Sequence, residues 1–322
     1  MLSRRILIAA LPGLLAAPPV LAQGDFPNRT IRFIVGFPPG GTTDIAARLM
    51  APKMQALLGQ PVVVENRTGA GGNIGSEFVV RAPADGHTIL MGTIGGLSIN
   101  PALYGNLSFD PVTDLAPITR VGMILNVLAI PAERPWRDTA QLVAAAKSSP
   151  LTFGSSGAGG AGHMAGEQLN LMAGLQNIHV PYRGGAPLIT DLMAGRIDFA
   201  FTPASGAKPQ ADGGKLRMIA VSTKDRSTLL PEIPAVAEAP GLAGFDMADW
   251  SALMAPRGTP APVLRTLHGA ATAALRDPEL VAALAQRGIE STPSSPDECG
   301  AFIRAESAKW LPVVRASGAR PD

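Results

Sequence analysis

The sequence predicts an α/β protein of two domains, each a sheet flanked by helices. Three observations support this prediction. The chain has 322 residues, which exceeds the roughly 100–200 residues of a typical single domain. Short β-type runs alternate with helical patterns, as expected for parallel sheets covered by helices through right-handed crossovers. Two long extended stretches interrupt this alternation, which indicates that the chain passes between the two domains twice.

The alternation has two parts. The first runs from "TIRFIVGF" (strand) through "TDIAARLMAPKMQALLG" (helix), "PVVVEN" (strand) and "IGSEFVVRA" (helix) to "HTILMG" (strand). The second runs from "LTFGS" (strand) through "HMAGEQLNLMAG" (helix), "IHVPY" (strand), "APLITDLMAG" (helix) and "IDFAF" (strand) to "LRMIAVS" (strand). Each assignment follows from apolar spacing, which has a period near 3.6 in helices and near 2 in strands.

The two extended stretches are "LAPITRVGMILNVLAIPA", around residues 121–130, and "GFDMADWSALMAP", around residues 245–254. Neither has helical periodicity, so we interpret both as crossings between a discontinuous first domain and an inserted second one. The predicted first domain comprises residues 23–124 and 243–322, and the second comprises residues 125–242. The chain after the second crossing has helical patterns and is expected to fold back on the first domain.

Residues 1–22 have the features of a secretory signal peptide. A basic start with Arg4 and Arg5 precedes an apolar run, and small residues follow near Ala22, after which cleavage is expected. The run is too short to span a bilayer and is broken by Pro12. The protein is therefore predicted to be exported. The Ser3-Arg4-Arg5 sequence resembles a twin-arginine signal, so Sec and Tat export both stay open.

Composition excludes several classes of function. Loss of Arg4 and Arg5 would leave 25 basic residues against 25 acidic ones, so no net charge favours DNA or anionic membranes. Aromatic residues make up 5% of the chain, too few to predict a stacking platform for nucleic acid. The single cysteine, Cys299, cannot form an internal disulfide and is expected to be buried.

Three glycine-rich corners lie at strand-to-helix junctions. The first corner is "PPGGTTD" (38–44), the second is "NRTGAGGNIG" (66–75) and the third is "GSSGAGGAGH" (154–163). The first turn of a helix has unpaired N–H groups and a positive dipole end, and glycine lets a ligand approach the backbone closely. Such corners suit a small anion, at the edge of the sheet where ligands bind in open parallel folds.

The corners lack the residues that nucleotide-binding sites require. Gly157, Gly159 and Gly162 fit G-x-G-x-x-G, but no Asp or Glu follows the next strand before Asp191, so the ribose-binding acid is missing. No corner contains the Gly-Lys-Ser/Thr of a P-loop. "GSSGA" differs from a hydrolase nucleophile elbow because Ala158 replaces the final glycine.

Catalytic and metal chemistry have little support either. The four histidines show no metal-ligand spacing, and no cofactor is expected. His163 stands near Ser155 and Ser156, so a Ser–His pair is conceivable, although a packing or capping histidine is the simpler interpretation. Asp44 has two open roles, binding the free N–H groups of its own helix or contacting a ligand.

Several longer motifs together resemble one family. "FPPGGTTDIAARLM", "VVVENRTGAGGNIGSEFV", "ADGHTILMGT", "GHMAGEQL", "HVPYRGGAPLITDLMAGRIDFAF" and "LPEIPAVAEA" are similar, in order, to the tripartite tricarboxylate transporter receptors, also called Bug proteins. The resemblance implies a two-lobed periplasmic binding protein fold of type II. It also implies a receptor, not an enzyme, that binds a small organic acid between lobes that close over it. The expected partners are the permease subunits of a tripartite tricarboxylate transporter, and the expected state is a monomer.

The resemblance also implies where the ligand binds. Ligand carboxylates in the family are held by backbone N–H groups and waters from two facing corners, with a loop after "HTILM" beside them. Carried over to this chain, the ligand-binding residues are Phe37, Pro39, Gly40, Gly41, Thr42, Thr43, Asp44, Gly92, Thr93, Ile94, Ser155, Ser156, Gly157, Gly159, Gly160, His163, Thr202 and Pro203.

One departure from the family concerns the kind of ligand. Many relatives have an acidic or amide pair after the strand "IDFAF", whereas this chain has Thr202-Pro203. A ligand amine would lack a negative partner there, which favours a plain carboxylate over an amino acid. Two alternatives stay open, a sensory module that signals to a membrane kinase and an exported serine hydrolase that uses Ser156 and His163.

Overall fold

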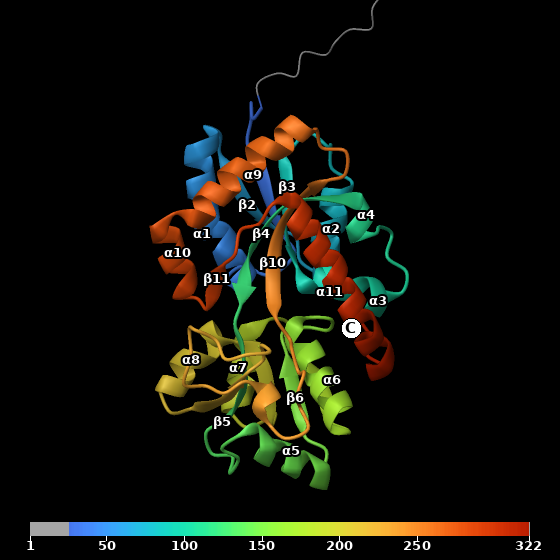
Figure 1. Ribbon diagram of the computed structural model, residues 1–322, viewed down its shortest axis with the longest axis vertical. Helices are drawn as coiled ribbons and strands as arrows, with labels where there is room; N and C mark the ends of the chain where they lie inside the picture. Colours follow the sequence, from blue (N-terminus) through green and yellow to red (C-terminus); the bar gives the residue numbers. More distant parts are fainter. Residues whose placement is uncertain (1–25, 322) are drawn as a thin grey trace, which may run out of the picture.

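The computed structural model describes residues 26–321, and the predicted signal peptide lies outside them. These residues form two lobes, one above the other, joined by extended chain (Figure 1). The first lobe contains a six-stranded sheet and the second a five-stranded sheet, each flanked by helices. This is the two-lobed α/β architecture that the sequence predicts.

The sheet of the first lobe has the order β11-β4-β10-β3-β1-β2. Strands β1, β2 and β3 are parallel, while β10 and β4 run antiparallel to their neighbours, as does β11. The strands are β1 (Ile31–Val35), β2 (Val62–Asn66), β3 (Thr88–Thr93), β4 (Leu115–Ile124), β10 (Asp249–Pro256) and β11 (Ile289–Ser291).

The sheet of the second lobe has the order β7-β6-β8-β5-β9. Strand β6 is parallel to β7 and β8, and β5 is antiparallel to β8 and β9. The strands are β5 (Asn126–Pro131), β6 (Thr152–Ser155), β7 (Ile178–Pro181), β8 (Phe199–Pro203) and β9 (Leu216–Val221). Both sheets are thus mixed, and the prediction of parallel sheets is right for β1, β2 and β3 and for β6, β7 and β8.

Three of the antiparallel strands, β4, β5 and β10, belong to the crossings. Strand β4 continues into β5 through the single residue Leu125, so the first extended stretch becomes a strand in each sheet. The chain returns after β9 and enters the first sheet again as β10. Strands β10 and β5 lead away from the boundary between the lobes, whereas β1, β3, β6 and β8 end near it, so β10 and β5 are antiparallel to β3 and β8. Strand β4 ends at the boundary, so it has the direction of β3, with β10 between them.

Helices cover both sheets. The first lobe contains α1 (Thr42–Leu58), α2 (Asn73–Val80), α3 (Asn100–Tyr104), α4 (Pro111–Asp114), α9 (Ala261–Arg276) and α10 (Pro278–Ala285). The second contains α5 (Thr139–Ser148), α6 (Ala161–Ala173), α7 (Gly185–Met193) and α8 (Ala204–Asp212). Both α1 and α6 end at a glycine in the left-handed region, Gly59 and Gly174, as is common at helix C-termini. The short turns are η1 (Ala70–Gly72), η2 (Gly95–Ile99) and η3 (Val236–Glu238).

The last helix, α11 (Pro296–Ser317), contacts both lobes. It begins with a capping box in which the Ser295 hydroxyl accepts from the Glu298 N–H and the Glu298 carboxylate accepts from the Ser295 N–H. It packs against β4 and η2 in the first lobe and against α6 in the second. The helix therefore lies against the first lobe and also reaches the second lobe.

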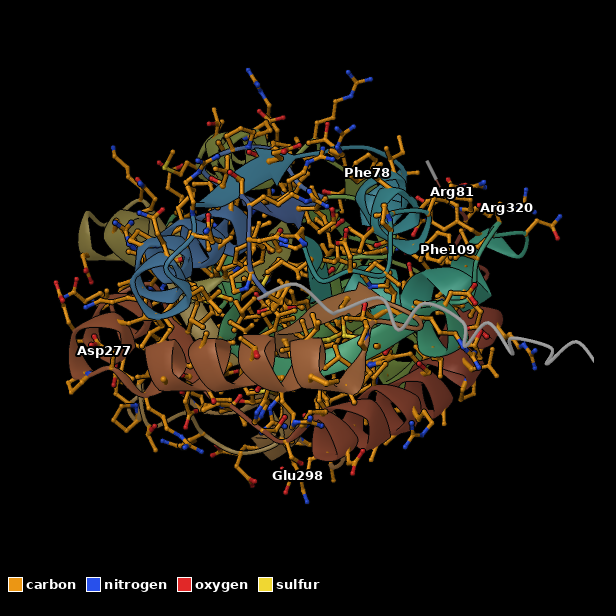
Figure 2. All side chains as sticks on the ribbon, turned by 90° about the horizontal axis from the view of Figure 1, so that it is seen from above. Phe78, Arg81, Phe109, Asp277, Glu298 and Arg320 are labelled. Atoms are coloured by element: carbon orange, nitrogen blue, oxygen red, sulfur yellow. The ribbon has the colours of Figure 1, made fainter. Side chains whose placement is uncertain are left out.

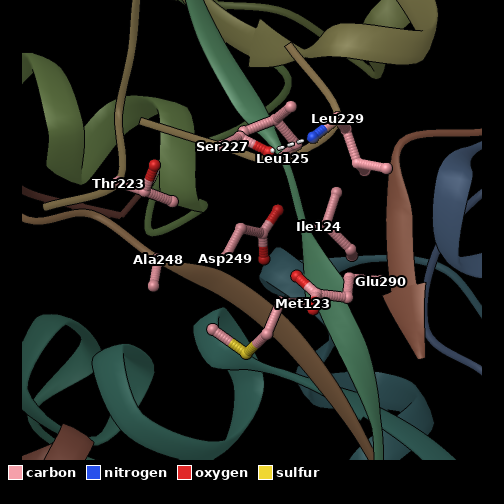
Figure 3. Close-up of a pocket in the computed structure, with 9 residues that line it drawn as sticks. All are labelled: Met123, Ile124, Leu125, Thr223, Ser227, Leu229, Ala248, Asp249 and Glu290. Carbon is pink, nitrogen blue, oxygen red and sulfur yellow. Dashed lines mark hydrogen bonds between the residues drawn. The ribbon is translucent and has the colours of Figure 1, made fainter. Parts of the chain in front are cut away.

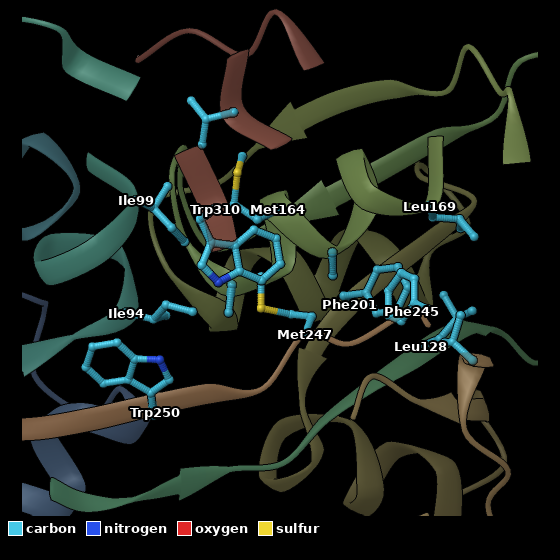
Figure 4. Packing of buried hydrophobic residues seen from close by; sticks show 14 of the residues in the cluster. Ile94, Ile99, Leu128, Met164, Leu169, Phe201, Phe245, Met247, Trp250 and Trp310 are labelled. Atoms are coloured by element: carbon cyan, nitrogen blue, oxygen red, sulfur yellow. The ribbon is translucent and has the colours of Figure 1, made fainter. Parts of the chain in front are cut away.

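One hydrophobic cluster extends across the lobe boundary (Figure 4). Trp250 of β10 and Trp310 of α11 lie in it together with Met164 of α6 and Phe201 of β8. The Glu306 carboxylate accepts hydrogen bonds from both indole N–H groups, at 3.0 Å from Trp250 and 3.2 Å from Trp310. The two lobes therefore share a packed core on the side of α11.

Charged side chains lie around the rim of the molecule. Arg81, Asp277 and Glu298 point outward in the view from above (Figure 2). Within residues 26–321, no helix is both long and apolar enough to span a bilayer.

Candidate functional site

The first corner joins β1 to α1 and is open to solvent. Residues 38–41 are exposed, and Gly40 has a φ of 83°, which favours glycine. Gly41 is the N-cap of α1, and no side chain caps it. The N-terminus of α1 therefore presents its first-turn N–H groups at this corner.

Asp44 holds the first corner together from inside. Its carboxylate is 1% exposed and accepts hydrogen bonds from Gly40 N–H (2.9 Å), Arg48 Nε (2.9 Å) and Asn66 Nδ2 (2.8 Å). Burial alone would raise the pKa of Asp44, but the hydrogen bonds from Arg48, Gly40 and Asn66 outweigh it and hold the pKa below its usual value. The sequence left two roles open for Asp44, binding backbone N–H groups of its own helix or contacting a ligand. In the structure its carboxylate binds groups of its own corner.

The second corner lies directly against the first. A Cβ on Gly36 would lie 2.9 Å from the Gly72 Cα, and a Cβ on Gly72 would lie 3.2 Å from the Phe37 ring. Two backbones can approach this closely only because both residues are glycine. Helix α2 begins here at Asn73, whose side chain is 5% exposed.

The predicted loop residues Gly92, Thr93 and Ile94 lie beneath the surface. All three are buried at the end of β3, and Ile94 is part of the shared core. A Cβ on Gly92 would lie 2.6 Å from the Leu97 side chain. The π-helical turn η2 follows directly and leads into α3.

The third corner joins β6 to α6, and its backbone is fixed by hydrogen bonds within it. Ser155 is fully buried, and its hydroxyl donates to the Gly157 carbonyl at 3.0 Å. The Gly159 N–H donates to His163 Nδ1 at 3.0 Å. Ser156 is exposed, and the N-cap of α6, Gly160, has no side-chain cap.

Two stacked histidines lie under the third corner. The rings of His163 and His179 are 3.7 Å apart between centroids and 7° from parallel. Burial, and secondly the proximity of His163, lower the pKa of His179 to about 3, so its imidazole is neutral near neutral pH. His163 Nε2 lies 3.6 Å from the Glu167 carboxylate.

These contacts bear on the Ser–His pair considered from the sequence. The serine–histidine hydrogen bond that forms joins Ser155 Oγ to His179 Nε2 at 2.7 Å. His163 uses Nδ1 to accept from Gly159, so this nitrogen does not act as a base toward Ser156. The contact of His179 with Ser155 could not be predicted from a local sequence pattern, because His179 lies 24 residues away and reaches Ser155 only through the pairing of β7 with β6.

Thr202 and Pro203 lie at the end of β8 beside the first crossing. Their antiparallel partners are Val127 and Asn126 of β5, and Thr202 is 2% exposed. The pair contributes no charge at this position.

The structure brings the second and third corners into contact across the lobe boundary. A Cβ on Gly71 would lie 3.4 Å from the Ala158 carbonyl oxygen and 3.2 Å from Asn100 Nδ2. Asn73 and Asn100 contact each other here and were not among the predicted site residues. The Gly-Gly-Asn sequence at the start of α2 could have indicated Asn73 as a residue of the site. No local sequence pattern indicates Asn100.

Two cavities lie outside the corners. One of about 40 Å³ adjoins the crossings and is lined by Leu125, Asp249 and Glu290, among others (Figure 3). Another of about 500 Å³ adjoins Phe26, His87 and Val263 in the first lobe. In residues 26–321, no group of three or more His, Cys, Asp or Glu is placed to hold a metal ion.

Comparison with known proteins agrees with this architecture. A model of the tripartite tricarboxylate transporter family receptor matches residues 46–319. Protein BugT of Bordetella pertussis is 34% identical over 307 residues, which cover 94% of each chain. The solved structure of the periplasmic binding protein BugD is 31% identical and has a TM-score of 0.84, covering 92% of this chain and 100% of that one.

Two further similar structures contain organic acids. Rpa4515 of R. palustris with adipate is 34% identical with a TM-score of 0.86, covering 92% of this chain and 100% of that one. MatC of Rhodopseudomonas palustris with bound malate is 30% identical with a TM-score of 0.83, covering 90% of this chain and 100% of that one. The chain belongs to the tripartite tricarboxylate transporter receptor family, whose periplasmic solute-binding fold it shares.

Proposed function

We propose that this protein binds a small organic carboxylate between its lobes in the periplasm and delivers it to the membrane subunits of a tripartite tricarboxylate transporter. The main supporting observation is a pair of glycine corners, one per lobe, each leading into a helix with no side-chain cap. These are the N-termini of α1 at Gly41 and of α6 at Gly160. Uncapped N-termini provide N–H donors and a positive dipole for a carboxylate.

The expected affinity follows from the number of such donors. Each hydrogen bond to a charged group contributes about 1.5–3 kcal/mol. About two or three per carboxylate, less the cost of ordering the lobes, provide the roughly −8 kcal/mol of a micromolar complex. Adipate in Rpa4515 and malate in MatC make dicarboxylates the first ligands to test.

We assign the direct contacts to the exposed and half-buried parts of the corners. In the first corner these are Phe37, Pro39 and Gly40 to Thr43, and in the third they are Ser156, Gly157 and Gly160. Asp44, Ser155 and His163 support the corners from within, since their polar atoms bind neighbouring backbone groups. Thr202 and Pro203 supply no charge for a ligand amine, which supports a plain carboxylate.

We further propose that residues 23–124 with 243–322 and residues 125–242 move as two bodies. Leu125 is the only residue between β4 and β5, so the first connection is short enough to act as a hinge. Export through the segment of residues 1–22 would bring the protein to the periplasm as a monomer.

We also infer that binding is not followed by chemical turnover. The exposed Ser156 has no histidine oriented toward it, because His163 accepts from Gly159 through Nδ1. An activated ester would therefore give no burst of product with this protein.

A thermal-shift screen of the mature chain against mono-, di- and tricarboxylates tests the proposal. NAD and ATP belong in the same screen as anions of another class. A rise in melting temperature with at least one organic acid, and none with the nucleotides, is expected. Stabilisation by a nucleotide with no response to any acid would contradict it.

A further inference from the structure

Gly159 of the third corner lies directly against the first lobe. A Cβ on Gly159 would lie 2.5 Å from Asn100 Oδ1 and 2.7 Å from Leu103 Cδ2. A Cβ on Gly95 would lie 3.1 Å from the Gly159 carbonyl oxygen. The second lobe therefore approaches η2 and α3 of the first lobe so closely that a side chain at position 159 would require Asn100 and Leu103 to move.

Asn100 is held in one orientation on the first-lobe side. Its side chain is fully buried, and its Nδ2 donates to the Gly71 carbonyl at 3.1 Å and to Asn73 Oδ1 at 2.7 Å. A flipped amide would place Oδ1 against the Gly71 carbonyl oxygen, which can only accept, so this hydrogen bond fixes which atom faces Gly159. Asn100 follows the π-helical turn η2, a feature that often marks functional positions.

Gly159 is fixed from its own side as well. Its N–H donates to His163 Nδ1, and its φ of 73° is in the left-handed region. Two preorganised groups from opposite lobes thus meet at one point, while Asn100 also binds the second corner. Asn100 thereby links the second and third corners.

We propose that Asn100 is a positioning residue for ligand binding, and that its contact with Gly159 sets how closely the lobes approach when they close. The proposal rests on the proposed function in placing the ligand between the lobes. Asn100 acts through the third corner, since its amide nitrogen is already used by Gly71 and Asn73.

The contact between Asn100 and Gly159 is also compatible with lobes that must open again after closing. Asn100 Oδ1 has no hydrogen-bond partner among the described residues in this arrangement, and Asn73 Nδ2 has none either. Both atoms would regain hydration when the lobes separate, so closing at this point carries a desolvation cost. The contact therefore limits how closely the lobes approach and does not lock them together.

A matched pair of glycine variants tests the proposal. Gly159→Ala adds a methyl group at the contact. Gly174→Ala adds one at a similar φ of 64°, in the same lobe, with no atom within 4 Å. Both substitutions carry the same kind of backbone strain, so only the contact distinguishes them. Circular dichroism and melting curves would show that both variants fold.

Lobe closure is measured as the distance between spin labels attached to Leu57→Cys in α1 and Lys147→Cys in α5, two exposed positions. The native Cys299 is 1% exposed and burial raises its pKa to about 11, so it stays unlabelled. Spectra are recorded for the free protein and with an excess of adipate or malate. The distance readout needs no bound acid, so failure of ligand binding is detected separately.

The wild type and Gly174→Ala are expected to share a short-distance population. In Gly159→Ala the ratio of closed to open molecules should fall by roughly tenfold, as expected for an overpacked contact. Adding Asn100→Ala to Gly159→Ala should restore part of that population, because the Asn100 oxygen is gone although the Leu103 side chain still lies near the added methyl group. Equal distributions for Gly159→Ala and Gly174→Ala, or a wild type that is open in all conditions, would overturn the proposal. So would a double variant as open as Gly159→Ala alone.

Discussion

Asp249 should make the protein less stable as the pH rises toward neutrality. It is the first residue of β10, pairs with Ile124 of β4 and lies in the cavity beside the crossings (Figure 3). Burial raises the pKa of Asp249 from 3.8 to about 7, although the Trp250 N–H and the Asn126 amide both oppose the rise. The Asn126 contact is long, at 3.4 Å, so it compensates the buried charge only weakly.

The direction and size follow from linkage. A carboxyl whose pKa is higher in the folded state binds its proton more tightly there, so its contribution is complete below about pH 4 and is lost as the pH rises to about 7. At roughly 1.4 kcal/mol per pKa unit, the full loss is at most about 4 kcal/mol. Because the side chain is only half-buried, we expect about 2–3 kcal/mol between pH 5 and pH 8.

Urea unfolding of the wild type and of Asp249→Asn at pH 5, 6, 7 and 8 measures this effect. The unfolding free energy of Asp249→Asn minus that of the wild type should increase by about 2–3 kcal/mol from pH 5 to pH 8, because the amide of the variant does not titrate. Glu290→Gln is the control, because it changes a carboxylate that lines the same cavity and should leave the slope intact. A difference between the wild type and Asp249→Asn that does not vary with pH would refute the reasoning.

Two further substitutions test the packing and the first corner. Glu306→Leu leaves the indole N–H groups of Trp250 and Trp310 without an acceptor, and should cost about 2–6 kcal/mol of unfolding free energy in urea titrations, at about 1–3 kcal/mol for each group. A loss below about 1 kcal/mol would show that these N–H groups find other partners. Asp44→Asn removes the charge that binds Arg48 and one of the acceptors that order the corner, and should weaken binding of the best acid from the screen by roughly tenfold. Calorimetry that finds unchanged affinity would show that the first corner does not depend on Asp44.

The sequence predicted those parts of the fold that depend on local patterns. The β-branched runs gave β1, β2 and β3, and the apolar spacing gave α1 and α6 close to their observed limits. The two extended stretches gave the crossings. In contrast, the three residues of β11 are too few to show a period, and only pairing with β4 makes them a strand.

Strand direction and the supporting residues of the site depend on long-range contacts. Whether β5 is parallel or antiparallel to β8 is decided by where the crossing enters the second sheet, which no local pattern encodes. His179 reaches Ser155, and Asn100 reaches Gly71, only after the sheets form. The glycine corners were visible in advance because glycine has a local conformational reason to be there.

Titration calorimetry of the mature chain, residues 23–322, tests the central claim most directly. Adipate, malate and a tricarboxylate are injected separately, followed by NAD and ATP. Micromolar binding of at least one organic acid in a ratio of one per chain, with no heat from either nucleotide, is the predicted result. Micromolar binding of NAD or ATP, with none for any organic acid, would contradict the assignment of the protein as a carboxylate receptor.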